Sequence, residues 1–226
     1  MHPYLARLQT TLLDIMFPPL CGVCRGALIG REQERNVCDS CVARIPIRTA
    51  LSCPVCGARL ASGRKTCHAG APYRLAAACD YADARVQRLI WTLKYGKKTY
   101  PVRILAHLVE RHLASLAGLN LRSFTAIPMP MPIGRRMRRG FNQSGLIMER
   151  LATRGALSPA LTPLLARTRA VKPQTQTKGI AERRENVRGS FRTTNEPWIR
   201  GAKVLIVDDV HTTGATMAEA ARALKR

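Results

Sequence analysis

Apolar residues follow two different patterns along the chain, and the change falls near residue 75. Residues 20–70 contain few long apolar runs, whereas strand-like and helix-like segments alternate afterwards. We expect strands at residues 75–81, 124–130 and 203–207, and helices within residues 86–93, 102–113, 140–151 and 215–224. Strands that alternate with helices favour an α/β fold with a mainly parallel sheet and helices on both faces.

The N-terminal residues 1–19 predict a short helix. Apolar residues recur at helical spacing between Leu5 and Met16, and Pro18 and Pro19 would end the helix. Polar and charged residues interrupt this stretch, so it lacks the continuous apolar segment of a signal peptide. Because no run of about 18 uncharged apolar residues occurs anywhere, we expect no membrane span and a cytoplasmic protein.

Seven of the eight cysteines lie between Cys21 and Cys67, mostly in C-x-x-C pairs. Two such pairs can place four thiolates around one zinc ion, which would supply the stability that a small core cannot. The first predicted structural site contains Cys21, Cys24, Cys38 and Cys41. A second site is an open alternative, because two of its ligands would be neighbours in sequence; it would contain Cys53, Cys56, Cys67 and His68.

The chain is strongly basic, with 37 Lys and Arg against 14 Asp and Glu and a formal net charge of +23. A field of this sign concentrates polyanions, such as nucleic acid or phosphorylated metabolites, or an anionic membrane surface. A generally basic proteome is the alternative explanation, since arginine far outnumbers lysine.

The sequence VLIVDDVHTTGATM at residues 204–217 carries the most information. A buried strand would end at two acids, Asp208 and Asp209, where open α/β sheets bind ligands. The small-residue turn into the next helix can hold a phosphate on backbone N–H groups and hydroxyls. The acids suit sugar hydroxyls and a magnesium ion beside a pyrophosphate. The predicted phosphate-binding residues are Thr212, Thr213, Gly214, Ala215 and Thr216.

Two further basic segments have the positions expected of ligand-binding loops. Residues 133–144 would form a loop for pyrophosphate or a nucleic-acid backbone, or simply a solvated turn. Residues 166–188 would form a mobile catalytic lid or an ordinary linker. Their candidate ligand-binding residues are Arg135, Arg136, Arg138, Arg139, Gln143, Lys178, Arg183 and Arg184.

Five features together resemble the ComF family of competence proteins: the cysteine pairs, LKYG at residues 93–96, RRGFNQ at residues 138–143, Q-T-x-x-x-x-x-R-R-x-N-V at residues 176–187, and VDDVHTTGAT. The resemblance implies a double zinc ribbon at residues 20–72 and a type I phosphoribosyltransferase-like domain at residues 73–226, short at its C-terminal end. Asp208 and Asp209 would hold the ribose hydroxyls of phosphoribosyl pyrophosphate (PRPP). Gly70 stands where the family pattern has a cysteine.

Two functions remain open at this point. In the first, the protein binds PRPP and magnesium, acts in DNA uptake or natural transformation, and transfers the phosphoribosyl group to an acceptor that the sequence does not name. His211 is a weak candidate for the general base. In the second, it is a non-catalytic single-stranded DNA adaptor for a helicase or recombination protein. Only Phe141 is an aromatic residue within a basic loop, so DNA binding would involve phosphates with little stacking.

Overall fold

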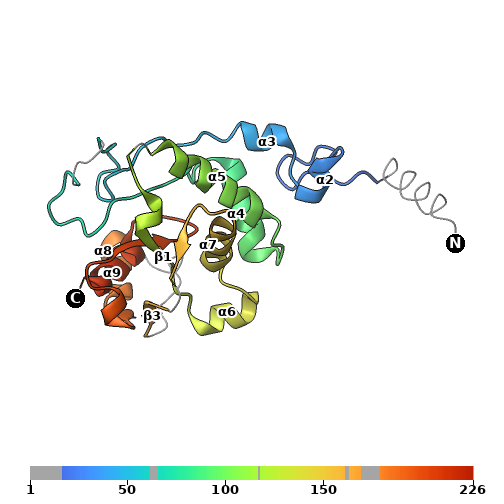
Figure 1. Ribbon diagram of the computed structural model, residues 1–226. Helices are drawn as coiled ribbons and strands as arrows, with labels where there is room; N and C mark the ends of the chain where they lie inside the picture. The colour runs from blue at the N-terminus through green and yellow to red at the C-terminus, as the bar shows by residue number, and fades with distance from the viewer. Residues whose placement is uncertain (1–16, 62–65, 117, 161–162, 169–178, 226) are drawn as a thin grey trace.

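The computed structural model describes residues 17–61, 66–116, 118–160, 163–168 and 179–225 (Figure 1). Its centre is a parallel sheet with the strand order β2-β1-β5, formed by β2 (Ser158–Pro159), β1 (Phe124–Pro128) and β5 (Lys203–Val207). Phe124 pairs with Lys203 and Pro128 with Val207, so β1 and β5 end at the same edge. The predicted strands at these two places are confirmed.

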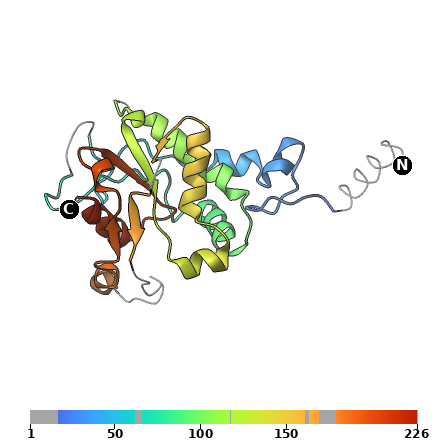
Figure 2. The ribbon, with the colours of Figure 1, turned by 60° about the horizontal axis from the view of Figure 1, so that its bottom comes forward.

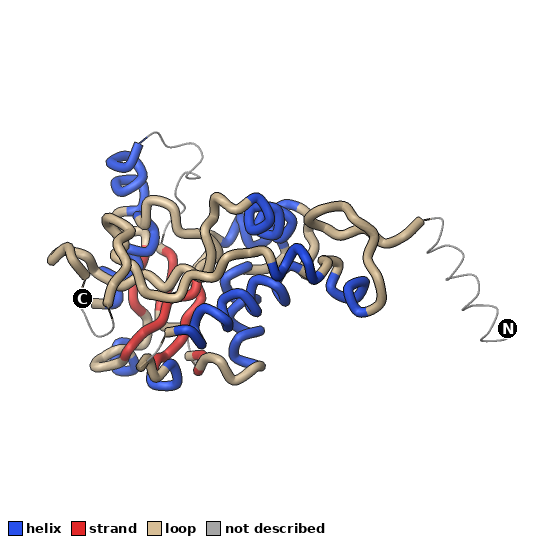
Figure 3. The backbone as a smooth tube through the Cα atoms, turned by 90° about the horizontal axis from the view of Figure 1, so that it is seen from above, coloured by secondary structure: helices blue, strands red, loops and turns tan. Residues whose placement is uncertain are grey.

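Side chains alternate between the two faces of the sheet, and helices cover both. Ala126 and Leu205 pack with α4 (Ala84–Tyr95), α5 (Pro101–Ser115) and α7 (Gln143–Thr153). Ile127 and Ile206 pack on the other face, with α9 (Ala215–Leu224). Figure 3 shows the strands side by side with helices around them. The predicted α/β class is confirmed.

Local sequence signals explain where the two long helices begin. The Asp83 carboxylate accepts hydrogen bonds from the backbone N–H groups of Arg85 and Val86, which caps α4. Pro101 begins α5, where a missing N–H costs nothing. The buried residues of α4 have the spacing that predicted the helix: Val86, Leu89, Ile90 and Leu93.

An antiparallel pair, β3 (Leu165–Arg167) and β4 (Phe191–Thr193), lies beside α9. Helix α8 (Gly179–Val187) precedes β4, and the buried Glu219 of α9 accepts a 2.8 Å hydrogen bond from the Gly189 backbone N–H. This contact lies directly after residues 166–188, which were predicted to form a lid or an ordinary linker. Residues 169–178 of that segment lie outside the described residues. Two short 3-10 helices, η1 (Leu121–Ser123) and η3 (Glu196–Trp198), precede β1 and β5.

The cysteine-bearing segment extends along one side of the molecule, from α2 (Arg31–Arg35) and α3 (Asp39–Ala43) at one end to residues 52–61 and 66–75 at the other (Figures 1 and 2). The Arg88 guanidinium donates to the Val23 carbonyl at 2.7 Å. The buried His112 Nδ1 lies 2.5 Å from the Arg48 carbonyl. Cys21 and Val23 also belong to the hydrophobic core that contains α4 and α5. The segment is therefore packed against the sheet domain.

Two local predictions are wrong. Residues 75–81 form no strand; Leu75 makes only an isolated bridge to Ser52, because its partner is the cysteine segment and not the sheet. Residues 133–139 form a helix, α6 (Ile133–Arg139), where a loop was expected. Arginine is a good helix former, and α6 ends at Gly140, whose positive φ of 86° suits glycine. The predicted N-terminal helix lies outside the described residues.

We expect Gly22→Ala to destabilise the protein. A Cβ atom at residue 22 would overlap the Tyr100 hydroxyl at the start of α5, and overpacking of this kind costs about 1–3 kcal/mol. Thermal unfolding of the zinc-loaded protein measures the loss, and Tyr100→Phe should recover part of it. Gly70→Ala is the matched control, because nothing lies within 4 Å of the added atom there. Equal melting temperatures for both glycine variants would contradict the packing described here.

Candidate functional site

The candidate site is a cavity of about 540 Å³ at the edge where β1 and β5 end. Parallel strands place their following loops at one edge, so residues that are distant in sequence meet there. The predicted residues that line this cavity are Asp208, Asp209, Thr212, Gly214, Ala215, Thr216, Arg135, Arg138, Arg139 and Gln143.

Asp208 and Asp209 have different environments. Asp208 Oδ1 accepts hydrogen bonds from the Ser144 hydroxyl at 3.0 Å and from the Asp209 backbone N–H at 2.9 Å. Burial, followed by the charge of Asp209, raises the pKa of Asp208 to about 7. Asp209 Oδ2 forms a 2.9 Å ion pair with Lys94 Nζ of α4. The pair therefore offers one carboxylate that titrates near neutrality and one whose charge is balanced by a lysine.

The threonine-rich turn leads from the acids into α9. Gly214 has φ 71° and precedes the first residue of the helix. A Cβ atom there would lie 2.6 Å from the Tyr73 hydroxyl and 2.8 Å from His211 Nε2, so glycine is required for space as well as conformation. Thr212 and Thr216 line the cavity, and the first turn of α9 presents backbone N–H groups to an anion. Thr213 is not among the lining residues.

Helix α6 forms a basic wall of the cavity. Burial, together with the neighbouring charges of Arg139 and Arg138, lowers the pKa of Arg135. An anion placed between these guanidiniums would relieve their repulsion. Arg136 is exposed and does not line the cavity.

Gln143, in the first turn of α7, is 1% exposed and lines the same cavity. Its Nε2 has no hydrogen-bond partner among the described residues. A buried amide without a partner is costly, so this group is suited to donate to a ligand.

The remaining basic candidates lie elsewhere. Arg184 is exposed on α8. Arg183 lies in the same helix, but its side chain is not among those that the structure describes. Lys178 lies outside the described residues. Among the described side chains, Arg184 does not line the cavity.

Sequence reasoning missed two residues that contact the acids. Lys94 belongs to the LKYG motif, and Ser144 directly follows RRGFNQ. Both motifs were noted for their resemblance to a family, but nothing in their local pattern connects them with Asp208 and Asp209. Only the packing of α4 and α7 against the same face of the sheet shows the connection.

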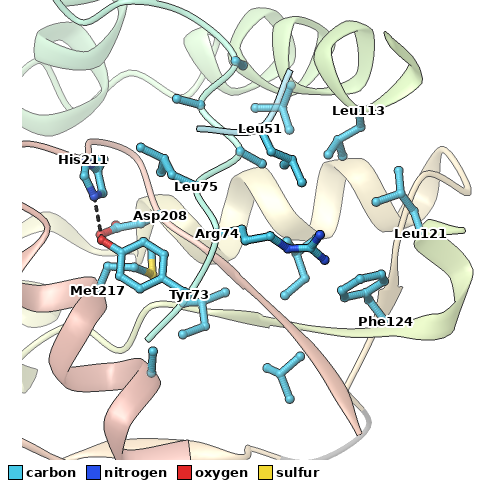
Figure 4. A pocket seen from close by; sticks show the side chains of 18 of the residues that line it. Leu51, Tyr73, Arg74, Leu75, Leu113, Leu121, Phe124, Asp208, His211 and Met217 are labelled. Carbon is cyan, nitrogen blue, oxygen red and sulfur yellow. Dashed lines mark hydrogen bonds between the residues drawn. The ribbon is translucent and has the colours of Figure 1, made fainter. Parts of the chain in front are cut away.

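A second cavity, of about 830 Å³, adjoins the first but has a mostly aliphatic lining (Figure 4). Leu51, Leu75 and Phe124 are among its walls, and Asp208 borders both cavities. Tyr73 and His211 face one another, and 2.7 Å separates the Tyr73 hydroxyl oxygen from His211 Nε2 (Figure 4). Burial lowers the pKa of His211, which favours the neutral imidazole.

Both cysteine groups converge in space. In each group the four ligand atoms all lie within 4.8 Å of one another: Cys21, Cys24, Cys38 and Cys41 form the first, and Cys53, Cys56, Cys67 and His68 the second. His68 Nδ1 lies 3.5 Å from Cys53 Sγ and 3.4 Å from Cys67 Sγ, so the neighbouring Cys67 and His68 reach the same point.

These separations fit zinc. Tetrahedral zinc with Zn–S of about 2.3 Å sets its sulfurs roughly 3.8 Å apart, and a sulfur roughly 3.5 Å from an imidazole nitrogen. Cys24 and Cys38 have sulfurs 3.8 Å apart. Backbone N–H groups point at the sulfurs. The N–H group of Cys56 has the largest effect on Cys53, whose pKa is lowered to about 6. A thiolate, the form that binds metal, is therefore favoured there.

Comparisons with known proteins agree with this architecture. Residues 12–73 match the double zinc ribbon domain, and residues 154–226 match the phosphoribosyl transferase domain. The chain is 32% identical to "DNA utilization protein YhgH" of Salmonella typhi and 33% identical to that of Escherichia coli O157:H7, over 92% of each chain in both cases. It is 27% identical to "Competence protein ComFC" of Bacillus subtilis, over 88% of this chain and 81% of that protein. No solved structure matches the chain significantly.

The fold and the two metal-ligand groups thus define a phosphoribosyltransferase-type domain that follows a double zinc ribbon with structural zinc. The extent of the similarity identifies the family. The chain belongs to the ComF family. In the described part of the chain, no helix is both long and apolar enough to span a membrane.

We expect His68→Ala to lower the zinc content of the purified protein from about two equivalents to about one, because three thiolates hold zinc less well than a closed four-ligand site. Elemental analysis measures the content. Cys79→Ser is the control, since Cys79 belongs to neither ligand group and should leave both equivalents in place. Unchanged zinc in the His68 variant would show that His68 is not a ligand.

We expect Asp208→Asn to stabilise the protein at about pH 8 but hardly at about pH 4. The carboxyl pKa is raised from 3.8 to about 7 in the folded state, so the free energy of unfolding falls as the pH rises through that window. Asparagine carries no charge and can still accept from Ser144. Melting curves of both proteins across this range measure the difference. A constant difference between them would contradict the raised pKa.

Proposed function

We propose that this protein binds PRPP with magnesium in the cavity between β5, α6 and α9, and that it serves the use of DNA taken up by the cell. The phosphoribosyl transferase domain supports a phosphorylated sugar as the ligand. The single observation that carries the finer assignment is that Asp208 and Asp209 line one cavity with the threonine-rich turn and the arginines of α6.

Each wall of the cavity matches one part of PRPP. The turn before α9 would bind the 5′-phosphate through backbone N–H groups and the hydroxyls of Thr212 and Thr216. Asp208 and Asp209 would accept hydrogen bonds from the ribose hydroxyls. Arg135 and Arg138 would balance the charge of the pyrophosphate. Magnesium, when bound, would neutralise further charge on that group.

The contacts that the acids already make position them for a ligand. Lys94 balances Asp209 at 2.9 Å and Ser144 donates to Asp208 at 3.0 Å. Because these side chains come from α4 and α7, two helices of the sheet domain hold the acids in place before a ligand arrives. Such preorganisation lowers the cost of binding.

The relatives' names support the DNA part of the proposal. Relatives that cover nearly the whole chain are called DNA utilization proteins, and another is called a competence protein. The net charge of +23 and the exposed arginines of α6 suit a phosphate backbone. A cytoplasmic location is part of the same proposal.

Titration calorimetry with PRPP and Mg²⁺ tests the ligand. We expect the wild type to bind, and Asp209→Asn to bind about 10- to 100-fold more weakly, because one charge-assisted hydrogen bond is lost. Asp39→Asn is the matched control: it makes the same chemical change at an exposed residue of α3, which pairs with Arg35 and does not line the cavity. No heat of binding for the wild type, or equal affinities for wild type and Asp209→Asn, would refute the assignment.

A further inference from the structure

Two large aromatic side chains lie exposed on α4, next to the candidate site. Trp91 is 59% exposed and Tyr95 64% exposed. They are four residues apart on one face of the helix, with ring centroids 5.3 Å apart and an angle of 56° between the planes. The leucines between and beside them, Leu89 and Leu93, supply the packing of α4 against the core. The aromatic pair is therefore not required to hold the helix in place.

Cationic side chains of α6 meet this pair. The Arg139 guanidinium carbon lies 5.5 Å from the centre of the Tyr95 ring, within the range of a cation–π contact. Arg135, Arg138 and Arg139 line the same cavity as Trp91 and Tyr95. Helices α4 and α6 are about forty residues apart in sequence, so the aromatic and basic groups come together only in the fold.

The surface continues past the cavity. Ile133 and Met137 of α6 are exposed, as are Arg136 and Arg138. Trp91 and Tyr95 of α4 thus meet the arginines of α6 at the cavity, while Ile133 and Met137 are exposed on α6 outside its lining. Exposed apolar groups interleaved with cations are typical of surfaces that bind unpaired nucleotides, whose bases stack and whose phosphates need counter-charges.

We infer that Trp91 and Tyr95, together with the arginines of α6, form a platform for the unpaired bases of single-stranded DNA. The inference rests on the DNA part of the proposed function and is independent of PRPP binding. One base would stack on the Trp91 indole, and an adjoining phosphate would contact Arg139, which lies over the Tyr95 ring. The strand would pass the mouth of the cavity that holds Asp209.

The combination of groups favours a single strand over other ligands. A duplex keeps the faces of its bases stacked inside, out of reach of Trp91. A free nucleobase has no phosphate and would leave the exposed arginines of α6 unused. A single strand uses both kinds of contact, and because every base has a π-face, such binding tolerates any sequence.

The two tryptophans of the chain provide a direct measurement. Trp198, in η3, is 64% exposed and does not line the cavity, so Trp198→Phe leaves Trp91 as the sole indole. We expect an oligothymidylate of about 16 nucleotides to quench the remaining fluorescence, because a stacked base quenches an indole. An abasic oligonucleotide of equal length and charge should bind more weakly and quench little.

Affinity provides the second measurement. We expect Trp91→Ala to weaken oligothymidylate binding about 10-fold while leaving the slope of log affinity against log salt unchanged, because a stacked base is lost but no phosphate contact. Trp198→Ala removes an equally exposed indole elsewhere and should leave the affinity unchanged. Retained zinc content and melting temperature confirm that the variants are folded.

Several outcomes would overturn the inference. Equal affinities for wild type and Trp91→Ala, or no quenching in Trp198→Phe, would remove Trp91 from the DNA surface. Quenching by free thymidine but not by the oligonucleotide would assign the platform to a small ligand. Failure of DNA binding with retained PRPP heats refutes this inference together with the DNA part of the proposed function. Retained DNA binding that is unchanged in Trp91→Ala refutes this inference alone, and loss of PRPP heats with retained quenching refutes only the ligand proposed for the cavity.

Discussion

The pairing of β1 with β5 in parallel register is the constraint on which the rest of the structure depends. Because Pro128 lies opposite Val207, the chain leaves both strands at the same edge of the sheet. The two acids leave β5 there, and the segment that becomes α6 leaves β1 beside them. A shift by one residue would turn the alternating apolar side chains of each strand to the wrong face. The cavity is therefore a consequence of how two short strands are aligned.

Helices on one face of this sheet then hold the acids. Lys94 and Ser144 reach Asp209 and Asp208 from α4 and α7, and both helices are fixed by buried leucines and isoleucines. The zinc ribbon packs on α4 and α5, through Arg88 and His112. The zinc ribbon and the helices that position the acid pair therefore share one hydrophobic core.

The sequence predicted what local patterns determine. The apolar run at β5, the capped helix α4 and the helix after Gly214 were all predicted, because each depends on residues close together in the chain. The strand at residues 75–81 was wrong, since apolar residues alone do not show whether a neighbouring strand is present. The loop predicted at residues 133–139 was wrong. Its basic residues suggested a ligand-binding loop, but arginine is also a good helix former, and the segment is helical.

Long-range pairs could not be predicted. The contact of Lys94 with Asp209 joins residues more than a hundred positions apart, and that of Tyr73 with His211 spans 138. Likewise, the expectation of little stacking rested on aromatics inside basic segments, whereas Tyr95 meets Arg139 across space. The convergence of Cys67 and His68 also required coordinates, since adjacent ligands are rarely assigned to one ion from spacing alone.

The ion pair between Lys94 and Asp209 has one more consequence. A ribose hydroxyl that donates to the Asp209 carboxylate would share this group with the ammonium group of Lys94. That group sits on the same helix as Trp91, directly before Tyr95. Because the proposed ligand is an anion, filling the cavity would make this side of α4 less positive, and by thermodynamic reciprocity an anion held there would make the cavity harder to fill.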